Sequence, residues 1–245
     1  MSYSDLTFKD KNPIKRWLQM SRLRTALRLA GELRSDATIC DFGAGSGELC
    51  KVLAPKYPQA RIICYEPTPS LLVEAQQNLR GLTNVEFEGD LSCVPEGSID
   101  VVFCLEVFEH LPPRETSDAL RQIKALLNDG GVGIIGVPNE IGLPALYKGL
   151  FRMTRRYGKF DATPRNVFLS FLGMPPTDRP VAEIASGIQY HFHHMGFDYR
   201  RLRKRLGTEF HMRHIAGSPV RLLGSLSNPE TYFVVSKEPW LAAGP

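Results

Sequence analysis

The sequence predicts an α/β protein whose doubly wound sheet has seven mostly parallel strands, with helices on both faces and a lid insertion. Short apolar runs alternate with helical patterns along the first 137 residues, as in parallel sheets covered on both faces. Three closely spaced glycines follow the first run directly, and acidic residues end the next two runs. The length of 245 residues suits one domain with an insertion.

Each element is predicted from its own pattern. Apolar or alternating runs predict seven strands, at 37–42, 61–66, 84–88, 98–105, 131–137, 209–215 and 231–236. Apolar residues at helical spacing predict helices at 46–57, 70–80, 115–127 and 197–206, the third ending at a turn formed by N128-D-G-G. This order is Rossmann-like. Residues 139–190, rich in Pro and Gly, interrupt the rhythm and are expected to form the lid.

The composition favours a soluble, cytoplasmic protein. The hydrophobic content of 43% is enough for a core, and no apolar run approaches the length that crosses a bilayer. We expect no secretory signal, because the N-terminal residues contain no apolar region. The 5 cysteines show no metal-type pairing and are expected to be reduced. Residues 1–140 carry 15 Lys/Arg against 19 Asp/Glu, whereas residues 141–245 carry 15 against 7. The positive net charge of the second part fits an anionic substrate, a membrane face or a solvated basic surface.

The glycines Gly43, Gly45 and Gly47 follow the first predicted strand and precede a helix. In open α/β folds, ligands bind at this edge of the sheet, where backbone N–H groups are free. Asp41 stands before the first glycine, where an anion suits an ammonium group better than a pyrophosphate. Glu66 can accept from ribose hydroxyls and Asp90 from an adenine amine, so S-adenosylmethionine fits the set.

These motifs resemble those of the class I S-adenosylmethionine-dependent methyltransferases. The match consists of D41-F-G-A-G-S-G47, Glu66, G89-D90-L91 and L105-E-V-F-E-H-L111, in that order. It covers residues 36–137 well and 197–236 more loosely. The resemblance implies a methyltransferase, with cofactor contacts from Asp41, Gly43, Ala44, Gly45, Glu66, Pro67, Asp90, Leu91, Leu105 and Glu106.

The stretch after the fourth strand also resembles two narrower groups, the ubiquinone-biosynthesis O-methyltransferases and the small-RNA 3′-terminal 2′-O-methyltransferases. In the RNA enzymes the equivalent residues bind a divalent ion, which implies a site made by Glu106, Glu109 and His110 with His193 or His194. Mg, Mn, Fe or Zn would suit such ligands. Two alternatives stay open: His110, with Glu109, acts directly as the catalytic base, or the pair supports the cofactor loop.

The order of the predicted elements divides the chain into four segments: a helical cap at 1–36, the cofactor-binding core at 37–137, the lid at 138–195, and a C-terminal helix with strands at 196–245. We expect O-methylation of a small-molecule or lipophilic hydroxyl acceptor enclosed by the lid. The alternatives are a metal-dependent RNA 2′-O-methyltransferase and a non-catalytic cofactor-fold binding protein. Aromatic and basic residues are interleaved at 141–172, which also suits peripheral membrane contact, without a transmembrane segment.

Overall fold

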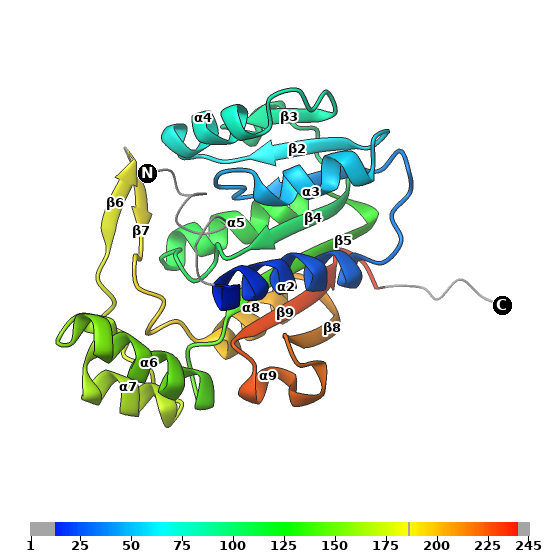
Figure 1. The fold of residues 1–245 in the computed structure, drawn as a ribbon. Coiled ribbons are helices and arrows are strands. Elements are labelled where there is room, and N and C mark those ends of the chain that lie inside the picture. Colours follow the sequence, from blue (N-terminus) through cyan, green and yellow to red (C-terminus); the bar gives the residue numbers. More distant parts are fainter. Residues whose placement is uncertain (1–12, 186, 240–245) are drawn as a thin grey trace.

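The computed structural model describes residues 13–185 and 187–239. Seven strands form one sheet in the order β3-β2-β1-β4-β5-β9-β8, which is drawn in Figure 1. The first five strands in the chain pair in parallel, whereas β9 pairs antiparallel with both β5 and β8. The prediction of a doubly wound, mostly parallel sheet of seven strands is therefore confirmed.

The strands of this sheet lie close to their predicted positions: β1 Thr38–Phe42, β2 Arg61–Tyr65, β3 Val85–Glu88, β4 Ile99–Leu105, β5 Leu127–Pro138, β8 His211–Ser218 and β9 Glu230–Ser236. The helices beside them are α2 Pro13–Ala30, α3 Glu48–Lys56, α4 Pro69–Asn78, α5 Pro113–Leu126 and α8 Tyr199–Glu209. The first 12 residues of the predicted cap lie outside the described residues.

One boundary differs from the prediction. Strand β5 begins at Leu127, directly after α5, so the turn predicted at 128–131 lies inside the strand. Leu127 pairs with Ile99, and the register then shifts before the pairing resumes at Val132. Gly131 makes this irregular pairing feasible, because a Cβ atom there would lie 2.9 Å from the carbonyl oxygen of Ile99.

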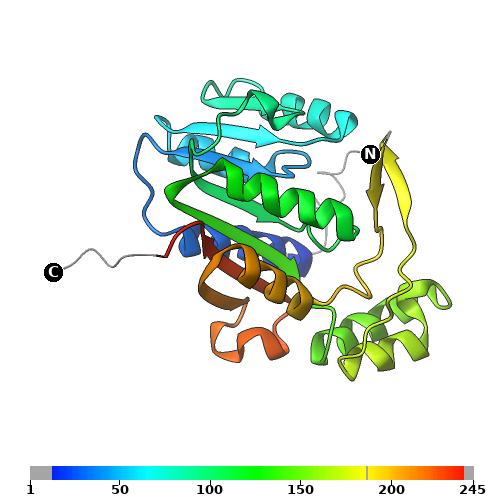
Figure 2. The same cartoon turned by 180° about the vertical axis from the view of Figure 1, so that it is seen from behind.

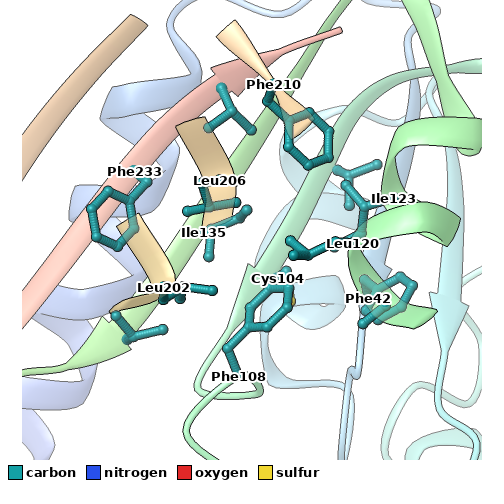
Figure 3. Packing of buried hydrophobic residues seen from close by; sticks show 14 of the residues in the cluster. Phe42, Cys104, Phe108, Leu120, Ile123, Ile135, Leu202, Leu206, Phe210 and Phe233 are labelled. Carbon is teal, nitrogen blue, oxygen red and sulfur yellow. The ribbon is translucent and has the colours of Figure 1, made fainter. Parts of the chain in front are cut away.

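Helices cover both faces of the sheet. Helices α2, α3 and α4 pack on one face, through buried side chains such as Leu23, Leu53 and Ala75. Helices α5 and α8 pack on the other face, which Figure 2 turns towards the viewer. Figure 3 shows this second core, where Leu120 and Ile123 of α5 and Leu202 and Leu206 of α8 pack around Cys104, Phe108 and Phe233.

The direction in which successive strands are added to the sheet reverses at β1. Strand β2 follows β1 on one side, whereas β4 lies on its other side. The carboxyl ends of β1 and β4 thus border a switch point, where ligands bind in folds of this type. The glycine-rich segment after β1 and the segment Glu106–Leu111 after β4 both lie at this edge.

The expected lid contains regular structure that sequence periodicity did not reveal. It forms α6 Leu143–Arg156, the 3₁₀ turn η2 Phe160–Ala162, α7 Pro164–Phe171, and a separate hairpin of β6 Ala182–Ala185 and β7 Ile188–Tyr190. Figure 1 shows the helices below the carboxyl edge of the sheet and the hairpin opposite that edge.

Helix α6 exposes its apolar side chains and buries charged ones, so apolar periodicity did not predict it. Its apolar side chains Leu143, Tyr147, Leu150 and Phe151 are exposed, at positions that share one helical face. Its charged residues Lys148 and Arg152 instead pair with buried Glu140. The sequence pattern of a helix is usually interpreted with the apolar face inward, and that assumption fails here.

Candidate active site

The three glycines after β1 have positive φ angles, of +77° at Gly43, +55° at Gly45 and +83° at Gly47. Each is therefore favoured by its backbone conformation, but their surroundings differ. A Cβ atom at Gly43 would lie 2.6 Å from Val107 Cγ2, and one at Gly47 would lie 2.6 Å from Leu79 Cδ1. Nothing lies within 4 Å of the same position at Gly45, so Gly45 has open space beside it.

Glu66 lies at the end of β2 and connects the glycine loop to α4. Its Oε2 atom accepts a hydrogen bond of 2.8 Å from the Gly45 N–H, and Oε1 accepts one of 2.9 Å from the Thr68 N–H. The side chain is buried, with 5% exposure. Because each carboxylate oxygen has two lone pairs, both oxygens keep a further acceptor position after these bonds.

Asp41 is buried at the end of β1 and is directed towards α3. Cys50 Sγ donates to Asp41 Oδ2 over 3.4 Å. Burial raises the pKa of Asp41 to about 7, and the charge of nearby Glu66 adds to this effect. The contact of Asp41 with the cofactor's ammonium group stays a prediction.

Asp90 is exposed at the end of β3 and caps the 3₁₀ turn η1 Leu91–Cys93. It accepts hydrogen bonds from the Ser92 hydroxyl over 2.7 Å and from the Ser92 N–H over 3.1 Å. The hydroxyl bond is the main reason why the pKa of Asp90 is lowered. Three further predicted cofactor residues, Pro67, Leu91 and Leu105, are half-buried at the same edge.

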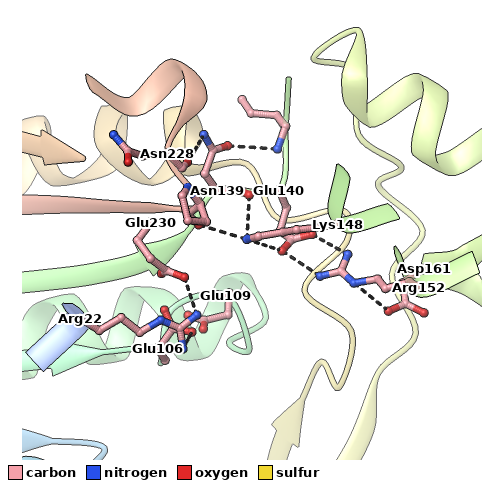
Figure 4. Close-up of polar contacts among 12 residues, drawn as sticks. Arg22, Glu106, Glu109, Asn139, Glu140, Lys148, Arg152, Asp161, Asn228 and Glu230 are labelled. Carbon is pink, nitrogen blue, oxygen red and sulfur yellow. Dashed lines mark hydrogen bonds and ion pairs between the residues drawn. The ribbon is translucent and has the colours of Figure 1, made fainter. Parts of the chain in front are cut away.

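Glu106 follows β4 and, among the described residues, is the one non-glycine residue with a positive φ, of 58°. Its N–H donates to the Gly136 carbonyl, and its Oε2 lies 3.2 Å from Arg22 Nη1. Arg22 also pairs with Glu230 of β9, as Figure 4 shows. Burial, together with nearby Glu230, raises the pKa of Glu106 well above its usual range. Such a strained conformation next to a strand end is typical of functional sites.

Glu109 is fully buried, and neither of its carboxylate oxygens has a hydrogen-bond partner. Burial raises the pKa of Glu109 to about 8. Glu109 Oε1 lies 3.7 Å from His110 Nε2. A buried, unpartnered carboxyl group is costly, so it points to a ligand, a proton or an ion that completes the site.

His110 is held in one tautomer. Its Nδ1 lies 2.7 Å from the His191 carbonyl oxygen, so Nδ1 carries the proton and Nε2 keeps its lone pair. The ring stacks on Tyr190 at a centroid distance of 4.3 Å and meets the edge of His194 at 4.7 Å. Burial lowers the pKa of His110 to about 4 and that of His194 well below its usual range. Both rings are neutral at pH 7.

The structure brings together three of the five predicted metal ligands. Glu109, His110 and His194 offer ligand atoms that all lie within 4.8 Å of one another. The other two turn elsewhere: Glu106 pairs with Arg22, and His193 Nδ1 lies 3.5 Å from Asp161.

Arg179 is a site residue that sequence reasoning missed. Its Nη2 donates to the carbonyl oxygens of Glu109 and His193, and its Nε donates to that of Met195. This half-buried guanidinium thus joins the segment after β4 to the histidine segment that precedes α8. Burial lowers the pKa of Arg179 to about 10. A lone arginine in a Pro-rich segment gave no sequence signal of this role.

A buried ionic network anchors the inserted helices (Figure 4). Glu140, directly after β5, pairs with Lys148 over 3.1 Å and with Arg152 over 2.7 Å. Arg152 also lies 3.6 Å from Asp161. These cations lower the pKa of Glu140 despite its complete burial.

Comparisons with known proteins agree with the fold. Residues 40–132 match a family model described as a methyltransferase domain. A SAM-dependent methyltransferase from Aquifex aeolicus superposes with a TM-score of 0.59 at 11% identity, over 97% of this chain and 100% of that one. A second match, with a TM-score of 0.56 at 15% identity, is the 1,6-didemethyltoxoflavin-N1-methyltransferase of Burkholderia thailandensis, with bound 1,6-didemethyltoxoflavin and S-adenosylhomocysteine; it covers 96% of this chain and 85% of that one. The chain has the class I methyltransferase fold.

The curated relatives are trans-aconitate 2-methyltransferases. One from Afipia carboxidovorans is 31% identical over 110 residues, which are 44% of this chain and 41% of the relative. One from Azoarcus sp. is 28% identical over 141 residues, which are 57% of this chain and 54% of the relative. The chain thus spans about half the length of these relatives. The narrower resemblance to ubiquinone-biosynthesis or small-RNA methyltransferases stays a prediction. No helix within residues 13–185 and 187–239 is both long and apolar enough to cross a membrane.

Proposed function

We propose that this protein is an S-adenosylmethionine-dependent methyltransferase that methylates a hydroxyl group of a small molecule. The matched methyltransferase domain, the fold and the curated relatives support the transfer of a methyl group. The orphaned carboxylate of Glu109, beside the neutral ring of His110, supports the choice of a hydroxyl acceptor.

The residues at the switch point fit the cofactor. Gly45 offers open space next to the glycine loop, and the spare lone pairs of Glu66 can accept from both ribose hydroxyls. Exposed Asp90 can accept from the adenine amine, and the Leu91 backbone lies beside it. The predicted contacts of Asp41, Gly43, Ala44, Pro67, Leu105 and Glu106 remain part of this proposal.

A hydroxyl acceptor must lose a proton during the transfer, so a base close to it is useful. Bound S-adenosylmethionine supplies an activated methyl group on its sulfonium. His110 Nε2 would take the proton that the acceptor hydroxyl loses when it receives this methyl group. Burial raises the pKa of Glu109 to about 8, so above that pH an ionised Glu109, 3.7 Å from Nε2, would stabilise the imidazolium that forms. The residue pair therefore suits the roles of base and supporting carboxylate.

The same cluster also fits a divalent ion. One carboxylate and two neutral imidazoles suit Zn, Fe or Mn better than Mg, and the empty acceptor positions of Glu109 are directed within the cluster. Glu109, His110 and His194 would then hold the ion, which would lower the pKa of the acceptor hydroxyl. An excess of chelator separates the two versions: it abolishes methyl transfer if the ion is needed and leaves the rate unchanged if His110 acts alone.

The described cations around the cluster favour a neutral acceptor over an organic acid such as trans-aconitate. Arg22 pairs with Glu106 and Glu230, and Lys148 pairs with Glu140. Arg179 donates to backbone carbonyls. None of these three is left to neutralise a carboxylate acceptor.

The decisive experiment measures methyl transfer from S-adenosyl-[methyl-¹⁴C]methionine to a panel of phenols, catechols and aliphatic alcohols, with trans-aconitate alongside. We expect label in a hydroxyl compound with wild-type protein and none with His110→Ala, while both proteins bind S-adenosylhomocysteine equally. Labelled trans-aconitate as the main product would overturn the choice of acceptor, and full activity of His110→Ala would overturn the role of His110. No binding of S-adenosylhomocysteine would overturn the proposal as a whole.

The other two predicted functions receive less support. The curated relatives are named for a small-molecule acceptor rather than for RNA, and a buried cluster of titratable groups suits chemistry better than passive cofactor binding. Peripheral membrane contact through 141–172 remains our proposal. The outward apolar face of α6, flanked by Arg155 and Lys159, supports an anionic lipid surface as the partner.

A further inference from the structure

A cavity of about 330 Å³ lies away from the glycine loop, between α2, α6 and the segment that leads into β9. Its volume is within the range of small-molecule sites. Leu18, Tyr147, Val220 and Leu223 form apolar walls, and Val220 at 47% and Leu223 at 50% exposure mark its mouth. Buried Glu230, at 3% exposure, marks its inner end.

The ammonium group of Lys148 borders this cavity but has no capacity left for a ligand. Its Nζ donates to the Asn139 carbonyl over 3.1 Å, to Glu140 Oε1 over 3.1 Å and to the Pro229 carbonyl over 3.0 Å. Three bonds use all three N–H groups of an ammonium. Buried Glu140 also balances the charge. Lys148 therefore provides neither a free donor nor a free positive charge.

Arg22, the second cation of the cavity, is also neutralised but keeps one donor. Its Nη1 pairs with Glu106 and its Nη2 with Glu230. Its buried Nε–H has no acceptor within the protein. Glu230 Oε2 has no hydrogen-bond partner within the protein either.

The amide of Asn228, another lining group, is likewise used within the protein. Its Nδ2 donates to the carbonyl oxygens of Val220 and Gly224, and its Oδ1 accepts from the Val220 N–H. Among these lining groups, one donor, Arg22 Nε, and one acceptor, Glu230 Oε2, are left for a ligand. A ligand with a carboxylate would bring a charge that no free cation can balance.

We propose that this cavity binds a neutral, largely apolar molecule through one oxygen that accepts a hydrogen bond from Arg22 Nε. The inference deepens the proposed function, because Arg22 also pairs with Glu106 at the end of β4, and Figure 4 shows Glu109 beside it. The occupant is then the acceptor, with its apolar part in the cavity. A molecule with three carboxylates, such as trans-aconitate, is excluded.

Two probes of equal shape test the class of ligand without cofactor and without turnover. 2-Acetylnaphthalene is neutral and has one carbonyl oxygen, whereas 2-naphthoate replaces its methyl ketone by a carboxylate. We expect calorimetric titration to show at least about tenfold tighter binding of the ketone, since the buried carboxylate would lack a partner. Trans-aconitate should not displace the bound ketone.

Val220→Trp locates the site, because a larger side chain at the mouth blocks entry. Val73→Trp is the matched control: Val73 is 50% exposed on α4 and does not line the cavity. We expect ketone binding to weaken at least tenfold in Val220→Trp and to stay at the wild-type level in Val73→Trp, with all three proteins melting at similar temperatures.

Three results would overturn the inference: tighter binding of 2-naphthoate, displacement by trans-aconitate, or undiminished ketone binding in Val220→Trp. Loss of ketone binding in both Trp variants would place the probe elsewhere and overturn it too. The result does not depend on the methyltransferase proposal, because neither probe binding nor melting involves S-adenosylmethionine. Failure to bind S-adenosylhomocysteine would count against the activity alone.

Discussion

Glu66→Gln tests the cofactor site most directly, because Glu66 has two tasks that this substitution separates. In the protein, its two oxygens each accept one backbone N–H, from Gly45 and from Thr68. Gln keeps the size of the side chain but replaces one acceptor by an NH₂ group. One of the two backbone donors then faces another donor, and the amide can no longer accept from two ribose hydroxyls.

The expected magnitudes follow from this count. One buried backbone N–H without an acceptor costs about 1–3 kcal/mol of stability. Loss of the charge-assisted bond to one ribose hydroxyl costs about 1.5–3 kcal/mol of binding energy, or roughly a tenfold to 150-fold weaker affinity for S-adenosylhomocysteine.

Isothermal titration with S-adenosylhomocysteine measures the affinity, and urea unfolding without ligand measures the stability. Glu86→Gln is the control, since Glu86 is exposed on neighbouring β3 and pairs with Arg61. We expect the control to keep wild-type affinity. Equal affinities of Glu66→Gln and wild type would refute the assignment of Glu66 to the ribose, even if stability falls as expected.

Three further outcomes are expected. Because burial raises the folded-state pKa of Glu109 from 4.5 to about 8, folding takes up a proton between these values, so wild-type unfolding free energy should fall as the pH rises through this window. Urea unfolding at pH 5.5 and 8.5 should show a smaller fall for Glu109→Gln but not for the exposed control Glu96→Gln; equal slopes in all three would contradict the shift. Phe151→Glu on α6 should reduce co-sedimentation with phosphatidylglycerol vesicles, whereas Val73→Glu should not; unchanged vesicle binding would remove the membrane proposal. Limited proteolysis should cut the hairpin region 176–190 before the core, and S-adenosylhomocysteine with a bound acceptor should protect it; resistance of this region throughout would make the inserted segment part of the rigid core.

The cofactor half of the protein could be predicted from sequence because its signals are local. A parallel strand buried on both faces is a short apolar run, and the glycines that follow β1 are adjacent in the chain. The spacing of the three glycines alone did not indicate which of them makes room for a neighbouring side chain and which leaves open space. Gly43 and Gly47 make room for Val107 and Leu79, and Gly45 is the one with open space. That distinction depends on side chains from the segments that follow β4 and α4.

The inserted segment could not be predicted from apolar periodicity, because helix α6 buries charged side chains and exposes apolar ones. Lys148 and Arg152 point inward to Glu140, and the apolar residues of α6 point outward. Gly149 allows this arrangement, since a Cβ atom there would lie 2.5 Å from Val167 Cγ2 of α7. A periodicity argument assigns the apolar face to the core, so it gives the helix the wrong orientation or none.

The arrangement of the segment after β4 could be predicted in part. Its sequence predicted that Glu106, Glu109 and His110 would act together, because residues at this spacing share one side of a helical turn. In the structure Glu106 has a positive φ and turns to Arg22, a residue of α2 that no pattern near it could indicate. Glu109 and His110 stay together and meet His194, because Arg179 donates to the carbonyl oxygens of Glu109 and Met195 and so holds the two segments against each other. The sequence spacing thus indicates the candidate residues of the site. Contacts with Arg22 and Arg179, which are distant in the sequence, determine which of these candidates lie together.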